Sequence, residues 1–125
     1  MPKVIILDTN FLMIPFQFKV DIFAEIARIC NFSYNLAALD RTVQELESIT
    51  KGRHKTSAAL ALQLLKKKDL KIIRTQSKKP VDDLIVEHAK KGAIIASQDA
   101  ELRGRVKNNG SRIIFLRNKK FLKLE

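Results

Sequence analysis

Short runs of apolar residues recur along the chain and are separated by longer, more polar stretches. The first run, at residues 4–7, is β-branched and aliphatic throughout, which is typical of a strand buried on both faces of a sheet. Four more runs of this kind follow it. The pattern predicts five strands, at residues 4–7, 34–39, 70–74, 93–96 and 113–116.

The stretches between these runs carry apolar residues at the three- and four-residue spacing of helices. Asp21 is suited to cap a helix that includes Ile22, Ile26 and Ile29 on one stripe. Further helices are predicted at residues 40–50, 56–68, 82–91 and 99–108. Because strands that alternate with helices pair in parallel through right-handed crossovers, we expect one domain over residues 1–125, a three-layer α/β/α sandwich around a five-stranded parallel sheet.

The charge of the chain is strongly unbalanced. Its 24 Lys and Arg residues against 13 Asp and Glu give a net charge of +11, which favours nucleic acid as a partner. The single cysteine, Cys30, excludes a disulfide within the chain and indicates a reducing compartment such as the cytoplasm. No apolar run approaches the about 20 residues of a membrane span, so no membrane partner is expected.

Acidic side chains follow the predicted strands. Asp8 ends the first strand, Glu45 lies one turn into the helix after the second, Asp82 and Asp83 open the helix after the third, and Asp99 follows the fourth. Because the carboxyl ends of parallel strands meet at one edge of a sheet, these acids are expected to converge there. Crowded carboxylates repel one another unless a cation neutralises them, and oxygen-only ligands favour Mg²⁺ or Mn²⁺.

Each acid also has a purely structural interpretation. Thr42 and Glu45 have the spacing of a capping box, and Asp82 and Asp99 are suited to the first turn or the N-cap of a helix. Asp8 is harder to explain in this way, since an acid at the end of an apolar strand lowers stability unless it is paired or binds a metal. The argument for a site therefore depends on the joint placement of the acids.

Four segments resemble the motifs of PIN-domain nucleases, and the resemblance extends over essentially the whole chain. In the first segment, a strand leads into Asp8, Thr9 and Asn10, and in the last a hydroxyl residue, Ser97, precedes Asp99. The four segments are residues 4–12, 45–46, 82–89 and 96–102.

The resemblance implies a PIN-like fold with the strand order 3-2-1-4-5 and catalytic acids around one or two Mg²⁺ or Mn²⁺ ions. Glu101 stands where some family members carry a further aspartate. The residues implied are Asp8, Glu45, Asp82 and Asp99 as catalytic acids, Asp8, Asp82 and Asp99 as metal ligands with Glu45 and Asp83 as further candidates, and Thr9, Asn10 and Ser97 as auxiliary residues.

The function implied is endonucleolytic cleavage of single-stranded RNA. The Asp82-Asp83 pair, the arginines after Asp99 and the basic tail are similar to the ribosomal-RNA-processing branch of the family. VapC-type toxin ribonucleases share the four-acid core and are a second interpretation, and a catalytically silent RNA-binding module is a third. Besides RNA, the partners left open are a second copy of the chain, an antitoxin and a ribosome-assembly protein.

Basic residues cluster beside the predicted site. Lys51, Arg53, His54 and Lys55 follow the helix of Glu45, and the helix opened by Asp99 carries several arginines. A folded domain with a charge of +11 repels itself, which favours a role for these clusters in binding phosphates. The residues expected to contact RNA are Arg53, Lys55, Arg103 and Arg105.

Three phenylalanines, Phe11, Phe16 and Phe18, follow the first strand near the predicted site. Packing under the loop after this strand or at a dimer interface is favoured over stacking on RNA bases.

Overall fold

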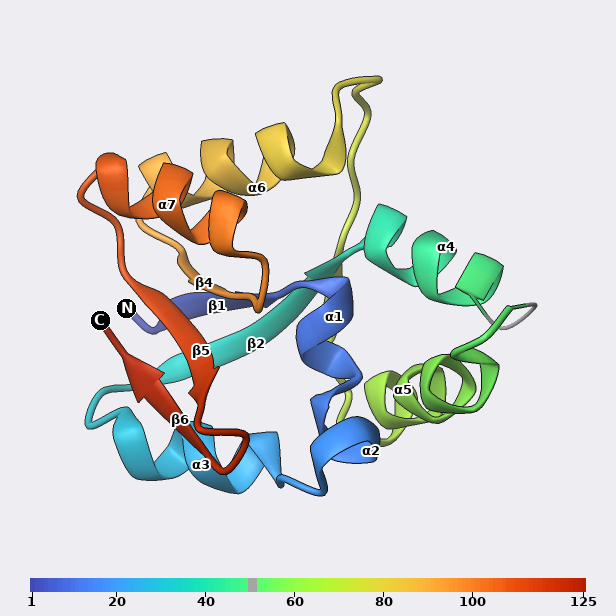
Figure 1. Cartoon of the computed structure of the whole chain (residues 1–125). Coiled ribbons are helices and arrows are strands. Elements are labelled where there is room, and N and C mark those ends of the chain that lie inside the picture. The colour runs from blue at the N-terminus through green and yellow to red at the C-terminus, as the bar shows by residue number, and fades with distance from the viewer. Residues whose placement is uncertain (50–51) are drawn as a thin grey trace.

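A six-stranded sheet forms the centre of the computed structural model, which describes residues 1–49 and 52–125 (Figure 1). Its strand order is β3-β2-β1-β4-β5-β6, and every neighbouring pair is parallel except β5 and β6. The strands are β1 (Lys3–Leu7), β2 (Tyr34–Leu39), β3 (Lys71–Ile73), β4 (Ile94–Ala96), β5 (Ile113–Arg117) and β6 (Phe121–Leu124). The predicted order and the parallel pairing of the first five strands are confirmed.

Helices cover the two faces of the sheet unequally. On one face α6 and α7 pack on Ile6 and Ile95, whereas the other face, with Ile5 and Leu7, is covered by the remaining helices. The helices are α1 (Thr9–Leu12), α2 (Ile14–Phe18), α3 (Ile22–Ile29), α4 (Asp40–Ile49), α5 (Lys55–Lys67), α6 (Val81–Lys90) and α7 (Ala100–Asn108). The predicted three-layer sandwich is confirmed, and Thr50, the predicted end of the fourth helix, lies outside the described residues.

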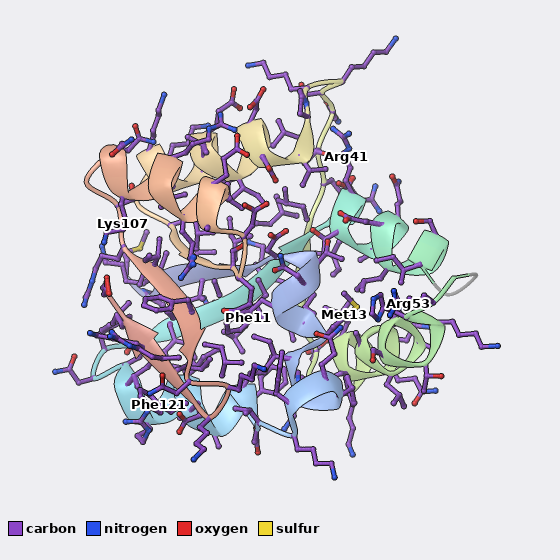
Figure 2. The ribbon with its side chains drawn as sticks, viewed as in Figure 1. Phe11, Met13, Arg41, Arg53, Lys107 and Phe121 are labelled. Carbon is purple, nitrogen blue, oxygen red and sulfur yellow. The ribbon has the colours of Figure 1, made fainter. Side chains whose placement is uncertain are left out.

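The segment after β1 differs from the prediction. This segment was expected to be a loop, but the Asp8 side chain accepts a hydrogen bond from the Thr9 N–H and caps the short helix α1. Phe11 within this helix (labelled in Figure 2) is fully buried, which agrees with packing beneath the segment. Local patterning missed the helix because it has only four residues.

The sixth strand corrects the prediction of five. Asn118 and Lys119 both have positive φ angles, as in the tight turns of hairpins, and they return the chain antiparallel to β5. The outer edge of β6 is held by α3, since the Leu122 N–H donates to Glu25 and the Arg28 guanidinium donates to the Leu122 carbonyl. The basic tail therefore includes an ordered edge strand.

No helix in the described ranges is long and apolar enough to cross a membrane.

Candidate functional site

Asp8 lies where β1 ends and α1 begins, at the carboxyl edge of the sheet (Figure 1). Its side chain is 7% exposed, and both of its oxygens accept hydrogen bonds, one from the Thr9 N–H at 2.9 Å and one from the Ser97 hydroxyl at 2.9 Å. An ionised carboxylate has about four lone-pair positions, so each oxygen retains a lone pair for a further partner. The strand thus holds a buried carboxylate in one orientation.

Ser97 connects Asp8 with Asp99. The fully buried Ser97 hydroxyl donates to Asp8 and accepts a hydrogen bond from the Asp99 N–H at 3.0 Å. Asp99 is the N-cap of α7, as its structural interpretation predicted, and its Oδ1 accepts hydrogen bonds from two backbone N–H groups. The Asn10 side chain accepts the Gln98 N–H at 3.2 Å and so joins α1 to the same turn.

Glu45 reaches the site through Thr9. The Thr9 hydroxyl donates to Glu45 Oε2 at 2.9 Å, which joins α1 to α4. The capping-box interpretation of Glu45 is wrong, because α4 already begins at Asp40 and the buried Thr42 hydroxyl has no hydrogen-bond partner among the described residues. The carboxylate of Glu45 is therefore directed toward the end of β1 by a contact between two helices.

Asp82 and Asp83 lie in the first turn of α6 but have different surroundings. The Asp83 carboxylate binds the Arg105 guanidinium at 2.8 Å. Asp82 accepts no hydrogen bond within the described part of the chain, and the N-cap position of α6 is held by Pro80. Asp82 is therefore a first-turn acid, as one of its two structural interpretations predicted, and not an N-cap. It is the acid of the pair whose oxygens accept no hydrogen bond within the described residues.

Asp40 is a residue that the sequence reasoning missed. Its carboxylate accepts hydrogen bonds from the Thr75 N–H at 3.0 Å and the Thr75 hydroxyl at 2.7 Å, and the Arg41 guanidinium donates to the Lys79 carbonyl. These contacts anchor the loop that leads to Asp82, and they hold the pKa of Asp40 below its usual value. The sequence did contain a signal for Asp40, because it lies directly after β2 as Asp8 lies directly after β1.

The acids affect one another electrostatically across this edge. Burial raises the pKa of Asp8, and the charges of Asp82 and Glu45 add to that effect against the opposing hydrogen bonds from Thr9 and Ser97. Burial and the charge of Asp99 raise the pKa of Asp82, while Arg105 opposes them. Negative charge at this edge is therefore insufficiently balanced by the protein's own cations.

This donor set has the chemistry of a site for a hard divalent cation. All four acids offer oxygen ligands, and Asp82, Asp99 Oδ2 and Glu45 Oε1 accept no hydrogen bonds within the described residues. In the described ranges, no three His, Cys, Asp or Glu side chains form a ready-made group that could hold a metal ion.

Of the basic residues predicted to contact RNA, two lie on α7 next to the acids. The Arg103 guanidinium stacks over the Phe115 ring, 4.7 Å from its centroid, and its buried Nε has no hydrogen-bond partner among the described residues. Arg105 is held by Asp83. Arg53 and Lys55 are exposed at the start of α5 (Figure 2), and Lys51 lies outside the described residues.

Comparisons with known proteins agree with this geometry. A family model described as a PIN like domain matches residues 5–119. The chain is 30% identical over 125 residues to Ribonuclease VapC4 of Methanocaldococcus jannaschii, an alignment that covers 96% of this chain and 95% of that protein. It is also 31% identical over 118 residues to Ribonuclease VapC9 of Archaeoglobus fulgidus, which covers 92% of this chain and 84% of that protein.

Solved structures show the same fold. The PIN domain endonuclease Utp24 superimposes with a TM-score of 0.83 at 24% identity, over 99% of this chain and 92% of that chain. A domain of a functionally unknown protein from Methanocaldococcus jannaschii superimposes with a TM-score of 0.63 at 19% identity, over 92% and 91% of the two chains. Together with the match of the family model and the two relatives, these findings show that the chain belongs to the PIN-domain nuclease family.

Proposed function

We propose that residues 1–125 form one PIN-like domain that acts as a Mg²⁺- or Mn²⁺-dependent endoribonuclease on single-stranded RNA. The observation that carries the proposal is the set of electrostatically coupled acids at the carboxyl edge of the sheet in a chain of charge +11. A protein that only bound RNA would gain nothing from carboxylates there, because they repel phosphate. The two ribonuclease relatives support the same reaction class.

In this proposal Asp8, Asp82 and Asp99 hold the cation, and Glu45 supports it. A bound divalent ion would activate water and offset negative charge at phosphorus. Ser97 and Thr9 orient Asp8 and Glu45 through hydrogen bonds, and Asn10 holds the turn that carries Asp99. Asp83 contributes by holding Arg105 beside the site and is not itself a ligand, because its carboxylate is already paired.

Arg103 is the residue best prepared to contact the scissile strand. The Phe115 ring supports one face of its guanidinium, and its buried Nε–H, which has no partner among the described residues, is a donor for a phosphate oxygen. Arg105, Arg53 and Lys55 would extend the track along the exposed ends of α7 and α5.

The direct test is cleavage of a structured RNA by the purified chain with Mn²⁺, with Mg²⁺ and with EDTA. Cleavage in the presence of either ion, and none in EDTA, is expected. RNA that is bound but left intact under all three conditions would favour the silent RNA-binding module.

A VapC-type toxin is the second candidate, because two relatives with that name align over nearly all of this chain. It predicts an antitoxin, encoded by a neighbouring gene, that binds the protein and blocks cleavage. A role in ribosomal RNA processing predicts instead a specific cut in a ribosomal precursor and association with ribosome-assembly proteins. Both roles fit a cytoplasmic protein, and both leave open a homodimer.

The RNA track can be tested through its dependence on salt. Binding should weaken as salt rises, with a slope near about −0.7 per neutralised phosphate, and the Arg103→Ala/Arg105→Ala double variant should reduce that slope by about one to two units. The matched control is Lys90→Ala/Lys107→Ala, which removes equal charge; Lys107 is bound to Glu125 at the far end of α7 (Figure 2). Equal slopes for the two double variants would place the track elsewhere.

The bond between Thr9 and Glu45 gives a second test. Thr9→Val keeps the size of this buried side chain but removes the hydroxyl that orients Glu45, and we expect activity to fall about tenfold. Thr9→Ser restores the hydroxyl and should recover most of the activity. Equal activity in Thr9→Val and the parent protein, measured at saturating Mn²⁺ and at limiting Mn²⁺, would exclude Glu45 from the site.

A further inference from the structure

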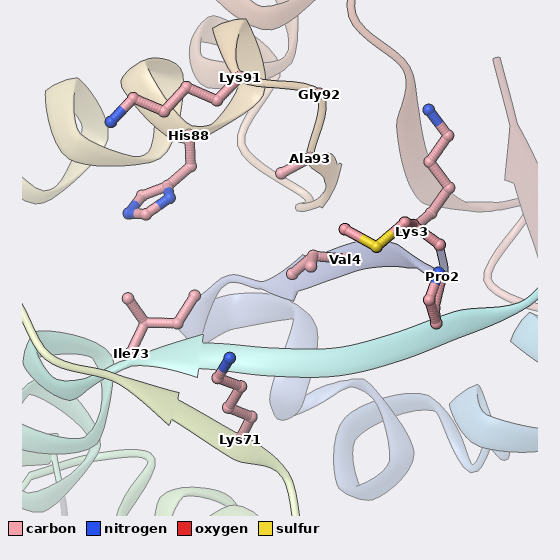
Figure 3. A pocket seen from close by; sticks show the side chains of 10 residues that line it. Pro2, Lys3, Val4, Lys71, Ile73, His88, Lys91, Gly92 and Ala93 are labelled. Carbon is pink, nitrogen blue, oxygen red and sulfur yellow. The ribbon is translucent and has the colours of Figure 1, made fainter.

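A concave site lies on the face of the sheet that carries α6, between that helix and β3 (Figure 3). It has a volume of about 390 Å³, within the range of pockets that hold small ligands. We call it the α6–β3 pocket. Its walls are formed mainly by Lys3 and Val4 of β1, Lys71 and Ile73 of β3, His88 of α6 and the segment 91–93 that follows it.

The α6–β3 pocket is separate from the acids. Lys3 begins β1 and Asp8 follows its end, which corresponds to about 17 Å along an extended strand. His88 lies six residues after Asp82 on α6, which corresponds to about 9 Å along a helix. No carboxylate lines the pocket among the described residues.

The lining combines cations with an apolar surface. Lys3, Lys71 and Lys91 form no ion pairs within the described part of the chain, while Val4 and Ile73 provide an apolar floor. In Figure 3, His88 projects from α6 toward the sheet, and Ile73 and Lys71 extend from β3 on the other side. The site therefore offers positive charge for an anion and a ring-sized apolar surface next to it.

His88 adds a hydrogen-bonding edge to the apolar floor. Burial and the charge of Lys91 lower the pKa of His88, which favours the neutral imidazole with one donor and one acceptor. The end of α6 does not repel an anion strongly, because the His88 carbonyl accepts N–H groups from Lys91 and Ala93, and the Ala89 carbonyl accepts one from Gly92.

We propose that the α6–β3 pocket binds a nucleoside phosphate, with the base against His88, Val4 and Ile73 and the phosphate at Lys71. Inorganic phosphate alone would leave the apolar floor exposed to water, and an uncharged nucleoside would leave the lysines without an anionic partner. A nucleotide satisfies both parts of the pocket. The same chemistry is present in a free mononucleotide and in a nucleotide of an RNA strand. The inference does not depend on the acids being catalytic.

The test is calorimetric titration of the full chain with AMP, adenosine, inorganic phosphate and a short 5′-phosphorylated RNA. EDTA is present throughout, so that no divalent ion links phosphate to the acids. AMP or the RNA should bind more tightly than adenosine and phosphate. Lys71→Ala should weaken that binding about tenfold, the loss expected for one hydrogen bond to a charged group. Lys67→Ala, which removes an exposed lysine outside the pocket, is the matched control.

The source of the ligand follows from which titrations depend on Lys71. If AMP binding depends on Lys71, a free nucleotide is a sufficient ligand. If only the binding of the RNA depends on Lys71, the ligand is a nucleotide within a strand. Both outcomes support the proposal. Phosphate binding as tight as AMP, or equal losses in Lys67→Ala and Lys71→Ala, would overturn it. Thermal melts of each variant confirm that it is folded, and His88→Ala should weaken AMP binding without affecting the binding of phosphate.

Discussion

Asp8→Asn is expected to reduce RNA cleavage about a hundredfold or more while leaving the fold of the protein without metal intact. Asparagine has nearly the same shape and can still accept the Thr9 N–H, and the Ser97 hydroxyl can accept from its amide. The change removes the negative charge on which cation binding depends. Altering residues that only support metal ligands already lowers metal affinity or activity about 10–100-fold, and altering a ligand itself should lower it further. The measurements are RNA cleavage rates and thermal melts, each with and without Mn²⁺.

The dependence of stability on pH separates this explanation from loss of structure. Folding raises the pKa of Asp8, so its ionised carboxylate lowers the stability of the folded protein at neutral pH. The parent protein regains that stability as the pH falls through the raised pKa toward the ordinary value of 3.8, because the carboxylate then becomes protonated. Without metal, Asp8→Asn should therefore be as stable as the parent or more stable at pH 7, and that difference should shrink on acidification. Full cleavage activity in the variant would exclude Asp8 as a metal ligand.

Phe11→Ala is expected to have the largest effect on stability, about 3–5 kcal/mol, because it empties the space of a fully buried aromatic ring. The ring belongs to α1 and packs in the core cluster shared with Ile5 and Leu7 of β1. Its loss should also disturb the turn that holds Asp8. The measurement is urea denaturation of the protein without metal.

Phe121→Ala is the matched control, since it removes the same ring from β6, where the side chain is 38% exposed (Figure 2). A surface substitution of this kind should cost less than about 1 kcal/mol. Comparable losses in the two variants would mean that Phe11 does not stabilise the core and would reopen its interpretation as a base-stacking residue.

Local patterns along the sequence determined most of the elements. The apolar run before Asp8 predicts β1, and Asp21 caps α3 as its position indicates. Such features depend on neighbours within one turn or one strand, so the sequence alone contains them. The rule that parallel strands expose their carboxyl ends at one edge then brings Asp8 and Asp99 to the same side, without knowledge of any packing detail.

Local patterns did not predict short elements that are stabilised by residues far away in the sequence. β6 has four residues and is held at its outer edge by Glu25 and Arg28, which lie almost a hundred positions earlier. Neither the tail nor α3 indicates this contact by itself. In the sequence, the basic tail was interpreted only as a feature similar to the ribosomal-RNA-processing branch, and no strand was predicted there.

The tertiary structure alone decided how the acids are held. Thr9 reaches Glu45 across 36 positions, and Ser97 reaches Asp8 across 89, so both bonds exist only because α4 contacts α1 and β4 pairs with β1. The capping-box pattern around Glu45 was misleading, because α4 starts two residues before Thr42 and frees Glu45 to face another helix. Periodicity records which side of an element is buried, whereas hydrogen-bond partners depend on the distances between elements, which no local pattern contains.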